Sequence, residues 1–356
     1  MGIFHDMLKA DQTIFKNPVA LEYEYLPKLI PFRENEQFAV AKAIKPLFQG
    51  RSGTNVVVYG RPGIGKTAAV RHILQELEEQ TDDIVPFYLN CWQKNSTYKI
   101  LLELCEQLEY KFTHNKKTDE LFQVVAKIIN KKAAVFVFDE CDKAEESDYL
   151  YLLLNEIYKK SIILITNDDE WIKHLDARIK SRLTPDLIAF RPYTLEQVKT
   201  ILAQRAEAAF YPGVLSDALL GTVAQKTYEL MDLRTGLFLL REAGNSCEEH
   251  SRKAITAEDV NAAIQKLDTF TSKSKDALDP DEQLVLSIAK AHSGKKIGDL
   301  FALYQQQGGK GTYKTFQRRI DKLASNGYIS VKKTQGGAEG NTTIIEASGL
   351  KKLTEF

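Results

Sequence analysis

Short apolar runs recur through the first half of the chain and predict strands. The run Asn55–Gly60 is continuously apolar rather than alternating, which is typical of a parallel strand buried on both faces. Helix-period segments separate the runs, and Lys66–Glu79 places Ile73, Leu74 and Leu77 on one stripe. This alternation predicts an α/β fold with a parallel sheet. The predicted strands are Asn55–Gly60, Val85–Asn90, Ala133–Glu140, Ser161–Asn167 and Leu187–Tyr193.

After Tyr193 the strands stop and the pattern becomes helical. Four amphipathic segments follow, and two of them begin with a good N-cap, Thr194 and Thr256. We interpret these segments as a small helical lid domain. The polar stretch Thr271–Pro280 ends in proline and is the predicted linker to a last domain. The lid helices are predicted at Thr194–Phe210, Ser216–Leu230, Thr235–His250 and Thr256–Phe270.

Beyond Pro280 the sequence predicts three helical stretches followed by a β-hairpin. The hairpin strands are Tyr328–Lys333 and Thr342–Ser348, and the turn between them holds three glycines. This order of elements is the pattern of a winged helix. The predicted domains are an α/β core with an N-terminal arm at 1–193, a helical lid at 194–270 and a winged helix at 271–356.

Charge is distributed unevenly along the chain. The 356 residues carry 48 Lys+Arg and 48 Asp+Glu, so the net charge of zero excludes a uniformly basic protein. The segment from Pro280 to Phe356 nevertheless has 12 basic and 7 acidic residues, a net charge of +5. The remainder of the chain has a net charge of −5. The predicted winged helix is therefore the basic part of the protein.

Cysteine usage and hydropathy exclude several other classes. The four cysteines show no C-x-x-C spacing and no accompanying histidine cluster, so we expect free buried thiols rather than disulfides or structural zinc. No apolar run reaches about 18 residues, the length that a membrane span needs. The first residues lack the pattern of a secretion signal. We therefore expect no membrane partner and a cytoplasmic, nucleoid-associated protein.

Residues 60–67, Gly-Arg-Pro-Gly-Ile-Gly-Lys-Thr, match the phosphate-loop motif G-x-x-x-x-G-K-[ST] completely. A predicted strand precedes the motif and a predicted helix follows it. The glycines let backbone N–H groups face a phosphate, and the helix N-terminus adds partial positive charge. Lys66 would reach the terminal phosphates of ATP or ADP, and Thr67 would hold Mg²⁺. The predicted nucleotide-binding residues here are Gly60, Pro62, Gly63, Ile64, Gly65, Lys66, Thr67 and Ala68.

Polar residues end two of the predicted strands, at the edge of the sheet where ligands bind in open α/β folds. We expect Asp139 to hold Mg²⁺, directly or through water, and Glu140 to act as the general base that polarises the attacking water. The alternative is that both acids cap the following helix. Asn167 could orient that water or contact the γ-phosphate, and the alternative is an ordinary turn-forming asparagine.

Two arginines are candidates for stabilising the charge on a γ-phosphate. Arg182 lies in ARIKSRL, after the strand that ends in Asn167, and Arg234 opens a lid helix. An arginine aimed at the γ-phosphate can raise the rate of hydrolysis by about 10³–10⁵, whereas most surface arginines are only solvated charges. The predicted catalytic residues are Glu140, Asn167, Arg182 and Arg234, and the predicted metal ligands are Thr67 and Asp139.

The third helix of the predicted winged helix is strongly basic. Phe316, Ile320 and Leu323 form its inner stripe, and this helix enters the major groove in DNA-binding winged helices. We expect some of its side chains to meet bases and others to meet phosphates. The alternative is a solvated face on a winged helix that binds protein. The predicted DNA-binding residues are Lys314, Thr315, Gln317, Arg318, Arg319, Lys332 and Lys333.

The order of these features resembles that of an AAA+ ATPase: phosphate loop, strand ending in Asp-Glu, asparagine sensor, SRL arginine and helical lid with an arginine. More narrowly, LPKLIPFREN, YLNC, VFDECD, FRPYTLEQ, ILAQRA and AITAEDVNAAI resemble the archaeal and eukaryal replication-initiator family. That family contains the largest subunit of the origin recognition complex and its cell-division-control relative, the helicase loader. The resemblance implies an AAA+ parallel-sheet ATPase core with a helical lid, followed by a C-terminal winged-helix domain.

The resemblance also implies roles for individual positions. Arg182 looks like the arginine finger that is given in trans to the ATP of a neighbouring subunit, and Arg234 looks like the lid sensor that acts in cis. The stretch Gln93–Asn115 occupies the place of a helical insertion that touches duplex DNA in the family. The arm Leu26–Arg33 looks like the segment that covers the adenine, with Leu29, Ile30 and Arg33 as the nucleotide contacts.

Three positions depart from the family pattern. Met231 stands where the lid motif typically has glycine, Phe32 stands where histidine often precedes the arginine of the arm, and Cys141 stands where an aliphatic residue is expected. Lys66 and Glu140 are intact, so we expect competent hydrolysis. The departures suggest a divergent paralogue.

We therefore expect a slowly hydrolysing, ATP-binding replication initiator. Its expected partners are duplex DNA at replication origins, the replicative helicase and related initiator paralogues. One alternative is a clamp-loader or transposition-type AAA+ ATPase, although a clamp loader would end in a helical collar rather than a winged helix. The other is an AAA+ switch whose winged helix binds a protein or promoter DNA.

Overall fold

The computed structural model describes residues 13–168, 170–276, 279–309, 311–325, 328–334 and 342–347. The chain divides into two compact units, one of residues 22–201 and one of the residues up to Leu21 and from Leu202 on. The division falls inside a single helix, α8 Leu195–Ala209. The domain boundaries predicted from the sequence stay predictions, and the two units are described separately below.

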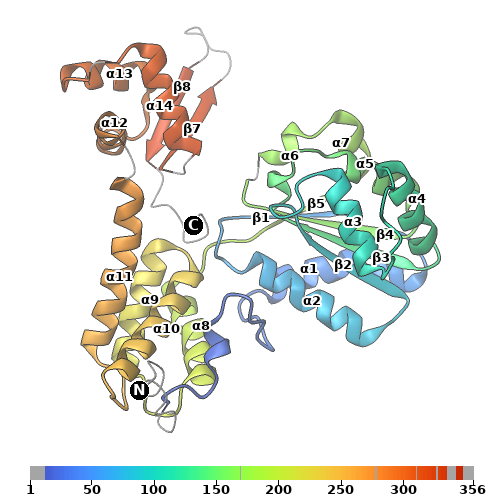
Figure 1. Cartoon of the computed structure of the whole chain (residues 1–356), viewed down its shortest axis with the longest axis horizontal. Coiled ribbons are helices and arrows are strands. Elements are labelled where there is room, and N and C mark those ends of the chain that lie inside the picture. The colour runs from blue at the N-terminus through green and yellow to red at the C-terminus, as the bar shows by residue number, and fades with distance from the viewer. Residues whose placement is uncertain are drawn as a thin grey trace. The chain divides into compact units, whose positions relative to one another are not determined.

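The first unit is built on a five-stranded parallel sheet with the order β2-β3-β4-β1-β5 (Figure 1). The strands occur at the five predicted apolar runs, which confirms the parallel α/β prediction. The last strand ends at Ala189 rather than at the predicted Tyr193, because its partner β1 ends at Tyr59, where the next loop begins. The bounds are β1 Val56–Tyr59, β2 Ile84–Asn90, β3 Ala133–Asp139, β4 Lys160–Thr166 and β5 Asp186–Ala189.

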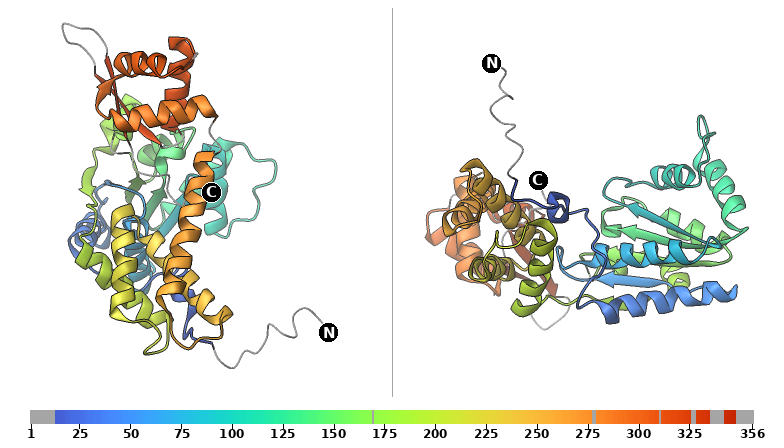
Figure 2. Two further views of the ribbon diagram at one scale, coloured as in Figure 1. Left: turned by 90° about the vertical axis from the view of Figure 1, so that its left-hand side faces the viewer. Right: turned by 90° about the horizontal axis from the view of Figure 1, so that it is seen from below.

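Helices cover both faces of this sheet (Figures 1 and 2). On one face lie α1 Glu34–Ile44 and α2 Lys66–Gln80, and a 3-10 turn, Lys45–Gln49, continues α1. A short helix, α6 Trp171–His174, follows β4. The other face is covered by α3 Thr97–Gln107, α4 Thr118–Ile129, α5 Asp148–Glu156 and α7 Ala177–Leu183.

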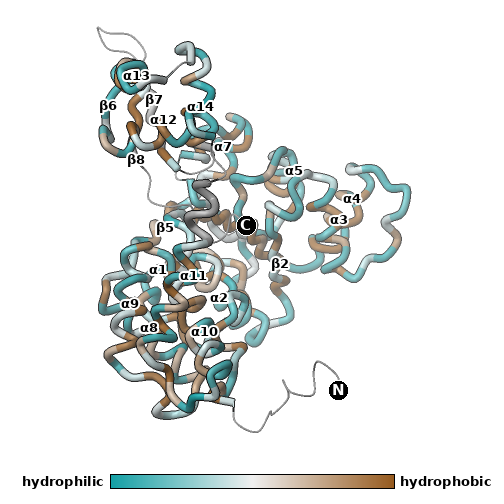
Figure 3. Tube along the Cα trace, turned by 60° about the vertical axis from the view of Figure 1, so that its left-hand side comes forward, coloured by the Kyte–Doolittle hydropathy of each residue, from teal (hydrophilic) through white to brown (hydrophobic). Residues whose placement is uncertain are grey.

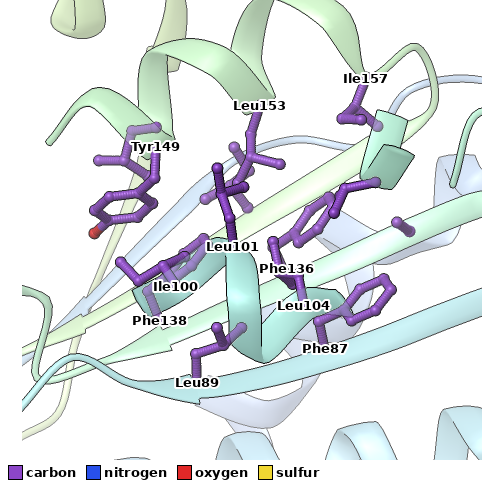
Figure 4. Close-up of a cluster of buried hydrophobic side chains, with 14 of the residues drawn as sticks. Phe87, Leu89, Ile100, Leu101, Leu104, Phe136, Phe138, Tyr149, Leu153 and Ile157 are labelled. Atoms are coloured by element: carbon purple, nitrogen blue, oxygen red, sulfur yellow. The ribbon is translucent and has the colours of Figure 1, made fainter. Parts of the chain in front are cut away.

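The main core lies between the sheet and the helices α3, α4, α5 and α7. Aromatic side chains of β2 and β3 stack there, with the ring centroids of Phe87 and Phe136 5.1 Å apart. Leucines of α3 and Tyr149 of α5 pack against these rings on the same face of the sheet (Figure 4). Along α3 and α4 the colours of Figure 3 alternate between hydrophobic and hydrophilic, as expected for helices with one buried face.

The second unit begins with four helices, which occur close to the four predicted lid segments. Residues 13–21 lie against them, since Phe15 forms a β-bridge with Phe210 and the two rings lie 5.1 Å apart. A 3-10 turn, Pro18–Leu21, follows this bridge. The helices are α8 Leu195–Ala209, α9 Asp217–Leu230, α10 Leu233–Glu249 and α11 Ala257–Asp276.

The predicted linker Thr271–Pro280 is wrong for most of its length, because α11 continues to Asp276. Its polar composition contains no residue that breaks a helix before the proline. The next helix begins at that proline, and the Asp279 side chain accepts a hydrogen bond from Glu282 N at 2.7 Å. Pro280 is therefore the first residue of a capped helix rather than the end of a loop.

Three helices and a small antiparallel sheet complete the second unit, as predicted for a winged helix. Their core is formed by residues such as Leu300, Tyr304, Phe316 and Ile345. The sheet has the order β6-β8-β7 and includes one short strand that was not predicted. The elements are α12 Pro280–Ala291, β6 Lys295–Lys296, α13 Ile297–Gln306, α14 Tyr313–Ser325, β7 Ile329–Thr334 and β8 Thr342–Ala347.

The cysteines fit the sequence-based expectation. All four are free thiols and are buried: Cys91, Cys105, Cys141 and Cys247. Within the described ranges, none of the helices combines the length and the apolar character that crossing a bilayer requires.

Candidate functional site

The phosphate loop connects β1 to α2, and its backbone depends on glycine. Gly63 and Gly65 have φ angles of 72° and 87°, in the left-handed region that side chains disfavour. A Cβ atom at Gly60 would collide with the carbonyl oxygen of Phe190. The loop can therefore wrap closely before α2 begins at Lys66, and it presents the N-terminus of a 15-residue helix to an anion.

The side chain of Lys66 points back into this loop. Only 6% of the residue is exposed, and its Nζ donates hydrogen bonds to the carbonyl oxygens of Gly60 at 2.7 Å and Arg61 at 2.8 Å. It also donates to Oδ1 of Asn167 at 2.8 Å. The structure thus brings together Lys66 and Asn167, which lie 101 residues apart in the chain.

The carboxylate of Asp139 lies beside the first turn of α2 and receives three hydrogen bonds. Its Oδ2 accepts from Thr67 Oγ1 and from the hydroxyl of Tyr88, each at 2.7 Å. Its Oδ1 accepts from Glu140 N at 2.9 Å. Carboxylate and hydroxyl oxygens are the ligands that Mg²⁺ prefers, so Thr67 and Asp139 fit a magnesium ion. A bound ion would supply positive charge to the phosphates there.

Glu140 follows directly and adopts an unusual backbone conformation. Its φ angle of 52° is left-handed, which is uncommon for a residue other than glycine. It precedes a 3-10 turn, Cys141–Lys143, and its side chain makes no capping hydrogen bond to that turn. This geometry does not support the alternative in which Glu140 caps the following helix.

A second contact joins the segments that follow β3 and β4. The hydroxyl of Thr166 donates to Asp142 Oδ1 at 3.0 Å and accepts from Asp168 N at 2.9 Å. Thr166 lies directly before Asn167, and Asp142 lies two residues after Glu140. The hydrogen bonds therefore tie together the two backbone segments that carry the predicted sensor and the predicted base.

Arg33, predicted as a nucleotide contact, is almost completely buried, with 3% exposure. Its guanidinium donates to the carbonyl oxygens of Ile64 at 3.1 Å and Arg191 at 2.7 Å. It also donates to the Tyr193 hydroxyl at 2.9 Å and pairs with Glu36 at 2.8 Å. Arg33 therefore links the arm, the phosphate loop and the segment after β5, and these contacts point to a role in shaping the loop.

The other two predicted contacts of the arm differ in their surroundings. Leu29 is 75% exposed, whereas Ile30 is buried. An exposed leucine beside a buried isoleucine is compatible with a segment that covers a ligand on one side. The nucleotide roles of both residues stay predictions.

We expect the substitution Arg33→Ala to lower the free energy of unfolding by about 2–4 kcal/mol, because it leaves buried carbonyl groups without a donor. Chemical denaturation without nucleotide measures this loss. The matched control is Arg178→Ala, because Arg178 pairs with Asp176 in an exposed ion pair and should leave stability unchanged. Equal stability of the two variants would contradict the structural role of Arg33.

The two predicted catalytic arginines lie in different units. Arg182 is exposed on α7, with its guanidinium carbon 5.7 Å from the centroid of the Tyr151 ring. Arg234, at the start of α10, makes two hydrogen bonds to the carboxylate of Asp232, at 3.0 and 2.9 Å. Asp232 also accepts from Arg234 N and so caps this helix. The roles of both arginines toward ATP stay predictions.

The exposed face of α14 carries four of the predicted DNA contacts: Lys314, Thr315, Gln317 and Arg318. Arg319 instead turns inward, where it donates to the Tyr304 hydroxyl at 2.8 Å and pairs with Asp281 at 2.7 Å. This geometry points to a structural role for Arg319 rather than a phosphate contact. The backbones of Lys332 and Lys333 lie in β7, but their side chains and most of the wing tip lie outside the described residues.

Comparison with known proteins places these features in a family. Models of an AAA domain and of the Cdc6 AAA+ ATPase-type lid domain match residues 50–169 and 199–265. ORC1-type DNA replication protein 1 of Archaeoglobus fulgidus is 32% identical over 350 residues, which cover 91% of this chain and 84% of that protein. The chain belongs to the family of ORC1-type DNA replication proteins. ORC1-type DNA replication protein 2 of Methanosarcina mazei is 30% identical over 357 residues and covers 96% of this chain and 95% of its own length.

Solved structures of this family share the fold. The Aeropyrum pernix ORC1 protein in complex with DNA has a TM-score of 0.68 and 25% identity, covering 94% of each chain. The Aeropyrum pernix ORC2 protein, in ADPNP–ADP complexes, has a TM-score of 0.71 and 18% identity over the same shares. The protein is therefore an AAA+ ATPase of the replication-initiator type with a C-terminal winged helix, as predicted.

The residues predicted for the nucleotide site do not include Tyr88, whose hydroxyl donates to Asp139. The available signal was its position in β2, where Phe87 and Leu89 face the core, so that Tyr88 must face the opposite side of the sheet. Asn90 pairs with Asp139 across the ladder, and Tyr88 precedes that pair on the same face. A tyrosine near the carboxyl end of a strand that neighbours the strand ending in Asp139 is thus the sequence pattern that indicates such a donor.

Proposed function

We propose that this ORC1-type protein binds ATP with Mg²⁺ at the phosphate loop and hydrolyses it slowly, as a switch for its action on DNA. The observation that carries the proposal is a pair of hydrogen bonds, Lys66 to Asn167 and Thr67 to Asp139, which join the start of α2 to the ends of β3 and β4. Lys66 would exchange its carbonyl partners for phosphate oxygens. Thr67 and Asp139 would hold the metal, Asn167 would orient water, and Glu140 would polarise that water.

The second part of the proposal concerns DNA. The winged helix would bind duplex DNA at replication origins through the exposed face of α14, and the related Aeropyrum pernix ORC1 protein was solved in complex with DNA. We further propose that the nucleotide state controls this binding and the recruitment of the replicative helicase. A cytoplasmic location associated with the nucleoid agrees with such a role and stays a prediction.

Binding of the whole protein to duplex DNA, followed by fluorescence anisotropy with ATP and with ADP over a series of salt concentrations, tests the DNA proposal. If about six phosphates are neutralised, the affinity falls with roughly the fifth power of the salt concentration. Tight binding with a steep salt slope and a preference for origin sequences supports an initiator. ATP binding without DNA affinity in any nucleotide state favours an AAA+ switch whose winged helix binds protein.

We expect Arg318→Ala to weaken DNA binding about tenfold and to reduce the salt slope by about one, because one exposed cationic contact is lost. The matched control is Lys290→Ala, which removes an exposed charge on α12 and should leave the affinity unchanged. Arg319→Ala should instead lower the melting temperature, since Arg319 bonds Tyr304 and Asp281. Unchanged DNA affinity of the Arg318 variant would argue against α14 as the reading helix.

A further inference from the structure

Tyr88 contacts the proposed metal ligand from the neighbouring strand. Its hydroxyl donates to Asp139 Oδ2 at 2.7 Å, and the same oxygen accepts from Thr67 Oγ1 at 2.7 Å. The two donors come from different elements, β2 and α2, and both precede Asp139 in the chain. Asp139 is 4% exposed, so these hydrogen bonds replace most of the water that would otherwise solvate its charge.

The ring of Tyr88 is held in place by its surroundings. The guanidinium carbon of Arg71 lies 5.4 Å from the ring centroid, and Arg71 is one helical turn after Thr67 on α2. The backbone carbonyl of Tyr88 accepts a hydrogen bond from Gln107 Nε2 at 2.9 Å. These contacts hold the backbone and one face of the ring, and the hydroxyl is directed at Asp139.

We propose that Tyr88 is a positioning residue that holds Asp139 in the orientation needed for magnesium. This inference rests on the proposed function, in which Mg²⁺ accompanies the nucleotide. In the observed arrangement the Thr67 hydroxyl donates its hydrogen bond to Asp139, so its oxygen lone pairs remain available to a metal ion. Without the phenol, the carboxylate has one fixed partner fewer and can rotate away from Thr67. Partners of this kind orient metal ligands, and their loss typically weakens metal binding by about 10–100-fold.

The competing explanation is that the hydroxyl only satisfies a buried carboxylate. In that case its removal would lower the stability of the protein without changing how much magnesium the nucleotide site requires. The two explanations therefore differ in a binding measurement that is independent of catalysis.

The test is Tyr88→Phe, which removes one oxygen and retains the ring. A fluorescent ATP analogue is titrated onto the protein at increasing MgCl₂ concentrations and also in EDTA. We expect the Mg²⁺ concentration for half-maximal enhancement of binding to rise about 10–100-fold, with binding in EDTA unchanged. The matched control is Tyr149→Phe, because the Tyr149 hydroxyl lies beside the Cys91 sulfur, 3.9 Å away, and does not contact Asp139.

The outcomes separate this inference from the proposed function. If the wild-type protein binds nucleotide with a clear magnesium dependence that Tyr88→Phe leaves unaltered, the positioning role is wrong and the proposed function stands. If wild-type binding shows no magnesium dependence, both are wrong. Should Tyr88→Phe fail to fold, Arg71→Ala keeps the hydroxyl but loosens the ring, and it should shift the magnesium requirement in the same direction by a smaller factor. No shift in Arg71→Ala would then overturn the proposal.

Discussion

Lys66→Ala is expected to weaken nucleotide binding by at least about 100-fold and to abolish turnover. The ammonium is buried in the phosphate loop and contacts Gly60, Arg61 and Asn167. A charge-assisted hydrogen bond contributes roughly 1.5–3 kcal/mol, and Lys66 would make such bonds to phosphate oxygens. Isothermal titration calorimetry with ATP and ADP, followed by a phosphate-release assay, measures both effects.

The control for this experiment is Lys160→Ala. Lys160 is also partly buried and donates to a backbone carbonyl, that of Ile157, at 2.6 Å. It starts β4, whereas Asn167 follows the other end of that strand. If Lys66→Ala loses nucleotide binding and Lys160→Ala does not, the loss is due to the phosphate loop. Unchanged turnover in Lys66→Ala would contradict the proposed site.

Glu140→Gln is expected to reduce the rate of hydrolysis by about 10²–10⁴-fold while ATP affinity changes little. A general base contributes about this factor, and glutamine retains the size of the side chain but cannot accept a proton. The backbone N–H of Glu140, which donates to Asp139, is unaffected by the substitution. Single-turnover hydrolysis and equilibrium ATP binding are therefore the two measurements to compare.

Glu145→Gln provides the matched control, because Glu145 lies in the same segment and its carboxylate bonds Asn95 rather than any group of the site. Its hydrolysis rate should equal that of the wild type. If Glu140→Gln hydrolyses ATP at the normal rate, water must be activated by another group, and the role of Glu140 would be structural.

Much of the fold could be predicted because its signals are local. Continuous apolar runs mark the buried parallel strands, and the 3.6-residue period marks the helices between them. The failures have local causes too. Thr271–Asp276 is polar and looked like a linker, but nothing in it opposes helix formation, so α11 extends through it.

The parts of the site that lie in a sequence motif could be predicted. The parts that depend on a tertiary contact could not. The phosphate loop and the acids after β3 stand in recognisable strings. Arg319 is predicted as a DNA contact because it belongs to a basic cluster, whereas its inward turn depends on Asp281 and Tyr304, which belong to other helices. Tyr88 was missed for the same reason, because only the register of β2 with β3 brings it near Asp139.

The left-handed backbone of Glu140 has a consequence for how this protein evolves. A residue with a side chain costs about 1–2 kcal/mol in that conformation, whereas glycine adopts it freely. Glycine at position 140 would therefore make the fold more stable while it removes the proposed base. Selection for thermal stability alone should favour glycine at position 140. A lineage that retains glutamate there would therefore be one that still depends on hydrolysis.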